Sequence, residues 1–442
     1  MRTVAVALTT SSLLLAAGAA TAVPAAAVPA PVPASGAVAG LDVPIPDTPA
    51  GRQLRWLLAA VPDAPIPEDQ LIEHFTEEML RLLPPAQLNE YFATIGDLRL
   101  DRILQAEPAA ILAEVTAGGR TQWMELSVDA SGRIAMARLM NPITPKPTPA
   151  SWKEIDRRAR KAAARMGFMA AEITRDGVCR PVRGLAPRTA RPLGSMFKLY
   201  VLQAVARKIP DWNSTLVIRP ELKSLPSGEL QTRPDNSEVS VLEAAKLMIA
   251  ISDNTAADLL IHRVGRKAVE ATRSRDVPFL TTREMFVLKG ADYPAHARRY
   301  LSLGTKQREK YLAEVVAKVP LSAVEAWLQP RELDTIEWFG SPADVCAAHA
   351  GLRGLKDRRV EEVMTQNDAG LGLDPKTWRS VWFKGGSESG LLDLGFSART
   401  RDGRTFFVTA MASDPAAPLD EGNVGSELVA LARGAFTLME KG

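Results

Sequence analysis

The chain has 442 residues, of which 46% are apolar and 24% are charged, and its formal net charge is +3. This length is too great for one ordinary domain and suits two domains of unequal size. The small net charge gives no support to a nucleic-acid-binding protein or to a strongly basic membrane-binding surface.

Residues 1–22 have the layout of a secretory signal peptide. Arg2 precedes an apolar stretch that ends at Ala20-Thr21-Ala22, a small-x-small cleavage site. The apolar stretch is short for a membrane span. We therefore expect a secreted, extracytoplasmic mature protein without a membrane span, which begins with an Ala/Pro-rich tether over residues 23–49.

Residues 50–145 are predicted to form a small α+β domain. Helical patterns over 53–61 and 68–83 precede strand-like segments that are separated by turn residues. Helices followed by consecutive hairpins indicate one antiparallel sheet. The strand-like segments cover residues 97–104, 109–117, 121–129 and 133–140.

Residues 146–442 are predicted to form an α/β sandwich, with an antiparallel sheet and a helical lobe. This part begins with a helix over 151–166 and a strand over 167–174, and helical patterns dominate its middle. Strand patterns return near the end of the chain, so both ends of this region contribute to one sheet. The later elements are strands over 380–386, 391–400 and 405–413 and a helix over 425–442.

Cys179 and Cys346 are the only two cysteines, and the four histidines are scattered without metal-binding spacing. In a cytosolic protein both cysteines would be buried thiols, whereas in an exported protein a single pair predicts one disulfide. Because we expect export, we predict a Cys179–Cys346 disulfide, and we expect no metal and no cofactor.

The segment PLGSMFKLYV places Ser195 and Lys198 one helical turn apart. A serine hydroxyl is a weak nucleophile until a base removes its proton, and lysine can be that base when burial and a second cation disfavour its charged form. Taken alone, the pair is weak evidence, because Ser195 could be a helix N-cap and Lys198 a surface charge.

Two further motifs follow in order. Ser252-Asp253-Asn254 lies between two apolar helical segments, and Lys384-Gly385-Gly386 ends an aromatic strand. S-x-x-K, S-D-N and K-T-G are the motifs of class A β-lactamases and penicillin-binding proteins. The chain resembles that superfamily over about residues 150–442. As a whole it is similar to secreted actinobacterial serine hydrolases in which a ketosteroid-isomerase-like domain precedes a β-lactamase-like domain, an arrangement shared by a β-lactamase-like protein of the clavulanic acid pathway.

The resemblance implies that Ser195 attacks a carbonyl while Lys198 takes its proton. Ser252 would relay a proton to the leaving group, and Lys384 would be the second cation.

The resemblance also implies a set of substrate-binding groups. Asn254 would hold Lys198 and a substrate amide, and the backbone N–H groups of Ser195 and Ser387 would form an oxyanion hole. The implied substrate-binding residues are Asn254, Gly385, Gly386 and Ser387.

The sequence departs from that superfamily in three places. Gly385 replaces the hydroxyl residue of K-[TS]-G, which weakens recognition of a substrate carboxylate. No E-x-x-L-N glutamate is present, and Glu284, the carboxylate near the expected place, fits a salt bridge with an arginine better than a deacylating base. A longer connection over about 290–340 forms either a lid or an extension of the helical lobe.

Two functions fit these features. The first is an exported serine hydrolase that forms an acyl-enzyme on Ser195 with a small β-lactam, D-Ala-D-Ala-type or ester substrate and deacylates slowly with β-lactams. The alternative is a non-catalytic protein that binds cell-wall fragments or small molecules through a degenerate β-lactamase fold. Residues 50–145 show no isomerase acid/base pair, so this domain is interpreted as a scaffold or a ligand pocket.

Overall fold

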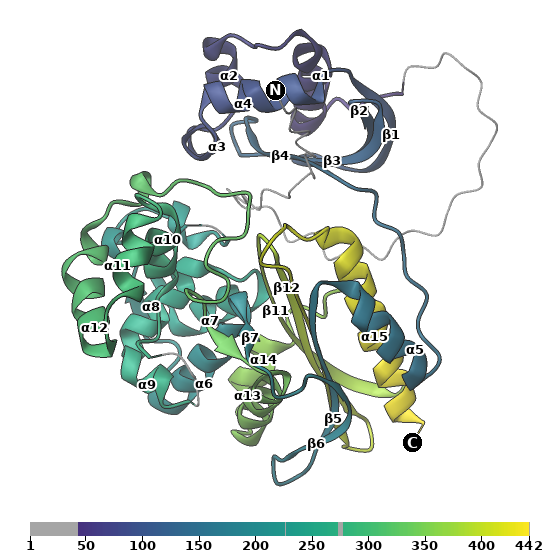
Figure 1. Ribbon diagram of the computed structural model, residues 1–442, viewed down its shortest axis with the longest axis vertical. Helices are drawn as coiled ribbons and strands as arrows, with labels where there is room; N and C mark the ends of the chain where they lie inside the picture. Colours follow the sequence, from purple (N-terminus) through teal and green to yellow (C-terminus); the bar gives the residue numbers. More distant parts are fainter. Residues whose placement is uncertain (1–42, 226, 273–276, 442) are drawn as a thin grey trace, which may run out of the picture.

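The computed structural model describes residues 43–225, 227–272 and 277–441. The predicted signal peptide and most of the predicted tether lie outside the described residues. Two regions with separate hydrophobic cores follow one another along the chain (Figure 1). None of the described helices has the length and apolar content needed to cross a membrane.

The N-terminal region packs helices against an antiparallel sheet of order β1-β2-β3-β4. Strand β2 alternates between buried and partly buried residues, because one face of the sheet packs against α1. The elements are α1 (Pro49–Ala60), α2 (Glu68–His74), α3 (Glu77–Leu82), α4 (Pro85–Ile95), β1 (Leu98–Glu107), β2 (Ala110–Ala117), β3 (Arg120–Val128) and β4 (Ile134–Met140).

The predicted helix over 68–83 is wrong in one respect, because it is two helices. Phe75 is extended and forms a β-bridge with Ile134, and the Thr76 side chain caps α3. The pairing with the sheet therefore overrides a continuous helical pattern. Helix α4 was not predicted; it begins at Pro85, where the missing proline N–H costs nothing.

The C-terminal region is built on a five-stranded antiparallel sheet of order β11-β12-β13-β5-β6. Strand β5, from the start of this region, pairs with β13 from its end. The prediction of one antiparallel sheet completed by both ends of the region, with a helical lobe, is confirmed. The strands are β5 (Arg165–Ile173), β6 (Cys179–Leu185), β11 (Trp378–Glu388), β12 (Leu391–Thr400) and β13 (Thr405–Ser413).

Both faces of this sheet are covered. Helices α5 (Trp152–Ala162) and α15 (Glu421–Glu440) pack together on one face, and the helical lobe covers the other (Figure 1). Strand β13 is accordingly buried at nearly every position rather than at alternate ones.

Strand β6 was not predicted. It is one of the two edge strands of the sheet and is mostly exposed. It also contains two arginines, so it lacks an alternation of apolar and polar residues. Pro181 lies at the irregularity where its register with β5 shifts, a position at which a strand tolerates the missing N–H. The predicted helix over 151–166 ends earlier than expected, because Arg165 already belongs to β5.

The helical lobe connects β6 to β11. It contains two short strand pairs, β7 (Arg191–Pro192) with β10 (Phe339–Gly340), and β8 (Thr215–Val217) with β9 (Glu238–Ser240). Its helices are α6 (Lys198–Lys208), α7 (Val241–Ala250), α8 (Asn254–Val264), α9 (Arg266–Glu270), α10 (Thr282–Gly290), α11 (Ala295–Leu301), α12 (Thr305–Glu314), α13 (Pro342–Gly354) and α14 (Arg358–Met364).

The proline-rich joint between the two regions is packed on α15. Thr144 N donates to Asn423 Oδ1 at 3.0 Å, and Ser426 Oγ donates to the Thr144 carbonyl at 3.1 Å. A Cβ on Gly434 would lie 2.5 Å from Pro149 Cγ, so the joint lies directly on the helix backbone. The segment therefore behaves as part of the C-terminal region and not as a free tether.

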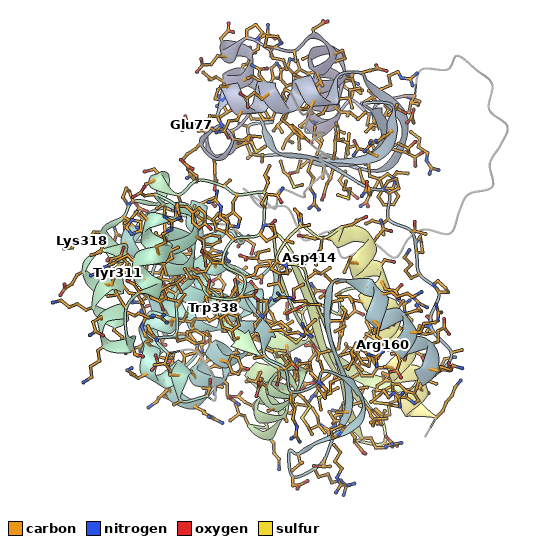
Figure 2. The ribbon with its side chains drawn as sticks, in the orientation of Figure 1. Glu77, Arg160, Tyr311, Lys318, Trp338 and Asp414 are labelled. Carbon is orange, nitrogen blue, oxygen red and sulfur yellow. A yellow bond between two sulfur atoms is a disulfide. The ribbon has the colours of Figure 1, made fainter. Side chains whose placement is uncertain are left out.

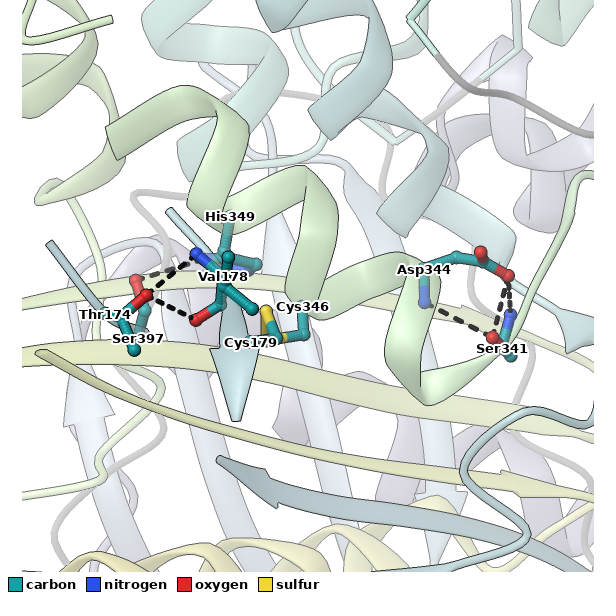
Figure 3. Close-up of a disulfide and its surroundings, with 8 residues drawn as sticks. All are labelled: Thr174, Val178, Cys179, Ser341, Asp344, Cys346, His349 and Ser397. Carbon is teal, nitrogen blue, oxygen red and sulfur yellow. Dashed lines mark hydrogen bonds between the residues drawn. A yellow bond between two sulfur atoms is a disulfide. The ribbon is translucent and has the colours of Figure 1, made fainter. Parts of the chain in front are cut away.

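The predicted disulfide between Cys179 and Cys346 is confirmed (Figure 3). It joins the first residue of β6 to α13, which begins with a capping box at Ser341 and Asp344. The bond closes a loop with a sequence separation of 167 residues. It ties the edge of the sheet to a helix of the lobe, so it restrains the two layers on either side of the cleft described below.

Candidate functional site

Ser195 lies on the 3₁₀ turn Gly194–Phe197, directly before α6. Its side chain does not cap either helix. Phe197 anchors this turn, because its ring stacks on Trp338 with centroids 3.8 Å apart. Trp338 lies between the helical lobe and the sheet (Figure 2). The turn is therefore held by apolar packing, and the Ser195 hydroxyl remains free to contact other groups.

Lys198 is fully buried. Its Nζ lies 3.0 Å from Ser195 Oγ and 2.7 Å from Asn254 Oδ1, and it also donates to the Ser252 carbonyl. The side chain is thus not a surface charge. It joins the turn that holds Ser195 to the turn between α7 and α8.

The turn between α7 and α8 has a strained backbone. Ser252 has a φ of 62°, in the left-handed region that non-glycine residues seldom adopt. Asp253 caps α8 through Ala256 N, and its second oxygen accepts from two further backbone N–H groups. Because Asp253 holds this conformation, Ser252 and Asn254 both face Lys198. The S-D-N motif therefore acts as a helix cap and also positions polar groups around the buried amine.

Lys384 reaches the same cluster from strand β11. Its Nζ donates to Ser252 Oγ at 2.7 Å and to the Gly385 carbonyl at 2.6 Å. Ser252 Oγ in turn lies 3.4 Å from Lys198 Nζ. The hydroxyl of Ser252 is thus placed between two buried amines from different elements of the fold.

Burial changes the protonation of both lysines. Desolvation lowers the pKa of Lys198 to about 7, although Asp253 and Asp258 act in the opposite direction. Desolvation, and then the charge of Lys198, lower the pKa of Lys384 well below its usual value. A neutral Lys198 amine has two protons for Asn254 and the Ser252 carbonyl, which leaves its lone pair for the proton of Ser195.

Strand β11 lies against the backbone of the Ser195 turn, and only glycine permits this approach. A Cβ on Gly386 would lie 2.2 Å from the Leu193 carbonyl oxygen and 2.8 Å from Ser195 N. A Cβ on Gly194, which has a φ of 46°, would lie 3.1 Å from Ser387 N. The two N–H groups implicated in an oxyanion hole, those of Ser195 and Ser387, are therefore brought close together.

These groups open into a cleft of about 440 Å³. The described residues lining it include Ser195, Ser252, Asn254 and Lys384, as well as Gly385, Gly386 and Ser387. The connection over 290–340 was expected to form a lid or an extension of the helical lobe. Its helices α11 and α12 extend the lobe, whereas residues 324–327 line the cleft. The structure thus brings all the predicted site residues together.

Beneath the cleft lies a buried charged cluster that the sequence analysis missed. Lys289 Nζ lies 2.5 Å from Glu388 Oε1 and 3.6 Å from Glu337 Oε1. Glu337 Oε2 accepts from Gly194 N at 3.2 Å, and burial raises the pKa of Glu337 to about 8. The cluster connects the residue before Ser195 with the residue after Ser387. No local signal marks it, because its members come from three distant segments.

Glu284 lies outside the cleft. Its carboxylate forms a two-pronged ion pair with Arg266, at 2.6 and 3.1 Å, and it completes the capping box of α10 with Thr281. Thr282, Met285 and Phe286 line the cleft, but Glu284 is not among the described lining residues. The expected salt bridge with an arginine is what the structure shows.

Two family models match parts of the chain. Residues 150–307 match the model of the beta-lactamase enzyme family. Residues 45–134 match a model described as the ORF 12 gene product N-terminal region. No curated protein matches the chain.

Several solved structures are similar to part of the chain. A beta-lactamase from Sphaerobacter thermophilus DSM 20745 is 18% identical, with a TM-score of 0.45, and the match covers 65% of this chain and 97% of that chain. PBP-A is 17% identical, with a TM-score of 0.43 and coverages of 67% and 100%. A class A beta-lactamase from Mycobacterium abscessus is 16% identical, with a TM-score of 0.41 and coverages of 65% and 98%.

The Glu284–Arg266 pair predicts a structural role for this glutamate. Glu284→Gln should lower the free energy of unfolding by about 1.5–3 kcal/mol, because it removes a hydrogen-bonded, largely buried charge partner. Glu309→Gln is the matched control, since Glu309 pairs with the exposed Lys267 and solvent screens this pair, so its loss should change the stability far less. Urea denaturation measures both, and equal stabilities of the two variants would contradict a structural role for Glu284.

Proposed function

We propose that this protein is an exported serine hydrolase that forms an acyl-enzyme on Ser195. The observation that carries the proposal is the position of the Lys198 amine, which is buried and lies 3.0 Å from Ser195 Oγ. Export is supported by the disulfide, since such bonds persist in oxidising compartments. The beta-lactamase family match over residues 150–307 supports the same class of chemistry.

In the acylation step, Ser195 Oγ attacks the substrate carbonyl while its proton moves to Lys198 Nζ. The developing oxyanion accepts hydrogen bonds from the N–H groups of Ser195 and Ser387. The tetrahedral intermediate then collapses as Ser252 donates its proton to the leaving nitrogen or oxygen. Ser252 recovers a proton from the adjacent lysine pair, so the step leaves an ester on Ser195 and a protonated leaving group.

Deacylation requires a base that activates water. Glu284 is bound to Arg266 outside the cleft. Glu337 lines the cleft, but its raised pKa keeps it protonated at neutral pH, and a protonated carboxyl group is a poor proton acceptor. Lys198 is the base that lies beside Ser195 Oγ, at 3.0 Å, and it can activate water only where the acyl group leaves room beside it. We therefore propose slow deacylation with bulky β-lactams and turnover with small esters or peptides of the D-Ala-D-Ala type.

The N-terminal region belongs to the proposal as a scaffold. Its four-stranded sheet covered by helices supports the similarity to ketosteroid isomerases stated above. The limits predicted for this region, residues 50 and 145, stay part of the proposal. The region is connected to the catalytic region through the joint packed on α15.

Ser195→Ala should abolish labelling by a fluorescent penicillin and by an uncharged fluorophosphonate, because the attacking oxygen is lost. Gel fluorescence and intact mass measure the label, and circular dichroism checks that the variant is folded. Ser322→Ala is the control, since this serine is exposed on the helical lobe. Full labelling of the Ser195→Ala variant would remove Ser195 from the proposed role.

A chromogenic cephalosporin should give a burst of about one equivalent followed by a slow steady state. The rate of the burst should exceed the steady-state rate by about a hundredfold or more, since general-base activation typically accelerates a reaction by about 10²–10⁴. Stopped-flow absorbance resolves the two phases, and intact mass detects the acyl-enzyme. Rapid linear hydrolysis without a burst would show that an effective deacylating base exists.

Acylation by an uncharged ester should accelerate as pH rises and reach half of its maximum near pH 7. Only the neutral Lys198 amine accepts a proton, and its lowered pKa of about 7 places the neutral form above that pH. Stopped-flow rates between pH 5.5 and 9 measure the profile. Lys198→Arg should remove the rise, because a guanidinium stays protonated throughout. A flat profile for the unmodified protein would contradict the role of Lys198 as base.

A further inference from the structure

The ionisable side chains that line the cleft are mostly acidic. Among the described lining residues, Lys384 is the only basic one. Five of these residues are acidic, namely Glu325, Glu337, Glu388, Asp393 and Glu421. A cleft that binds a substrate carboxylate needs cations or hydroxyl donors at its wall. The wall of this cleft has instead mainly acidic side chains among its ionisable groups.

The single basic side chain of this lining, Lys384, already forms hydrogen bonds inside the protein. Lys384 is 3% exposed, and it donates to Ser252 Oγ and to its neighbour's carbonyl. The next residue, Gly385, offers no hydroxyl beside it. A Cβ at this position would lie 2.9 Å from the Phe383 ring, so the ring occupies the space that a larger side chain would need. The strand therefore offers a substrate carboxylate little beyond one buried amine.

At the bottom of the cleft, the cation Lys289 is already bound by acidic residues, because it pairs with both Glu388 and Glu337. Asp393 is fully buried, and its Oδ2 has no hydrogen-bond partner in the described part of the chain. The cation that acts on it, Arg191, does not line the cleft. Burial raises the pKa of Asp393 well above its usual value, so this neutral carboxyl group supplies no charge that would attract a substrate carboxylate.

Two further carboxylates, Glu325 and Glu421, are more accessible. Glu325 is exposed, Glu421 is half-buried at the start of α15, and neither has an ion-pair partner among the residues that the structure describes. Arg138 is the cation whose charge acts on Glu421, and its guanidinium is bound to Glu125 at 2.6 Å. Burial raises the pKa of Glu421 to about 7, so its carboxylate form predominates at pH 8. The two side chains are therefore available to a ligand.

Two aromatic rings also line the cleft, and Trp327 follows Glu325 by two residues in the chain. The rings of Phe286 and Trp327 line the cleft with centroids 6.0 Å apart. Trp327 already has Arg331 at 5.6 Å and Lys289 at 5.9 Å from its ring, whereas no described cation lies over Phe286. Aromatic faces next to carboxylates are the usual surroundings of a bound alkylammonium group.

From these observations we propose that the cleft selects acyl substrates that lack a carboxylate and prefers those that carry an alkylammonium group near the reacting carbonyl. The proposal rests on the acyl-enzyme function and specifies its substrate class. Glu421 and Glu325 are the specificity-determining residues, and the Phe286 ring, which has no described cation over it, receives the methyl groups of the cation. Carboxylate-bearing substrates are disfavoured because their charge faces Glu421 and Glu325 and meets only one buried amine among the described lining residues.

Three 4-nitrophenyl esters of matched length test the proposal at pH 8. The acyl groups are 4-(trimethylammonio)butanoyl, its neutral isostere 5,5-dimethylhexanoyl, and the hemiglutaryl anion. The second-order rate constant for acylation of Ser195, corrected for uncatalysed hydrolysis, should fall in the order cationic, neutral, anionic. Intact mass confirms the site of acylation for each ester.

Glu421→Gln should reduce the cationic-to-neutral ratio of these rate constants by about three- to thirtyfold, the effect of one partly buried charge contact. Glu325→Gln should act in the same direction with a smaller change, because Glu325 is more exposed. Glu440→Gln is the matched control, since Glu440 is exposed at the other end of α15 and its loss should leave the ratio unchanged.

The outcomes separate the two proposals. Acylation of Ser195 with an equal or an anionic preference overturns the substrate class and leaves the serine hydrolase function standing. A cationic preference that Glu421→Gln and Glu325→Gln do not reduce also overturns the assignment of this specificity. Failure of all three esters and of the fluorophosphonate to modify Ser195 overturns the function, and the substrate class with it.

Discussion

The burial of the Lys198 amine is the constraint on which the rest of the site depends. A lysine with no access to water is stable only if it loses its charge or finds acceptors for its protons. The hydrogen-bond partners of Lys198 come from two elements, Ser195 before α6 and the S-D-N turn before α8. The unfavourable φ of Ser252 persists because Asp253 is fixed by three backbone N–H groups. Local strain is thus maintained by the surrounding hydrogen bonds.

The second requirement is that the sheet approaches the helical lobe closely enough for Lys384 to share Ser252. Gly194 and Gly386 permit this approach, because a Cβ on either would meet backbone atoms of the other segment. The stacked Phe197 and Trp338 and the Glu337 carboxylate hold the same boundary from the side of the lobe. The disulfide joins the two layers again at the far edge of the sheet. Apolar packing, hydrogen bonding and a covalent link therefore act on one interface.

The residues around the polar cluster determine which charges a substrate meets in the cleft. The polar cluster around Ser195 is the one that the three motifs describe, whereas the walls around it are acidic and aromatic. Glu421, one of the acidic residues of this wall, belongs to a helix that reaches beyond the cleft. It lies on α15, the helix on which the proline-rich joint is packed, and it is influenced by Arg138 of the N-terminal region. The N-terminal region thus contributes to the electrostatic surroundings of the cleft even though its own core is separate.

Several features of this protein follow from the sequence by itself. The order of S-x-x-K, S-D-N and K-G-G predicted the residues that converge on the cleft, and the alternating strands at both ends predicted the sheet, because periodicity records which face of an element is buried. Other features were decided only by the tertiary structure. Strand β6 and the break at Phe75 depend on pairing with distant strands, and pairing partners leave little trace in local periodicity. The Lys289 cluster and the acidic cleft wall likewise join segments far apart along the chain. Their energies depend on burial and distance, which are set when the whole chain packs.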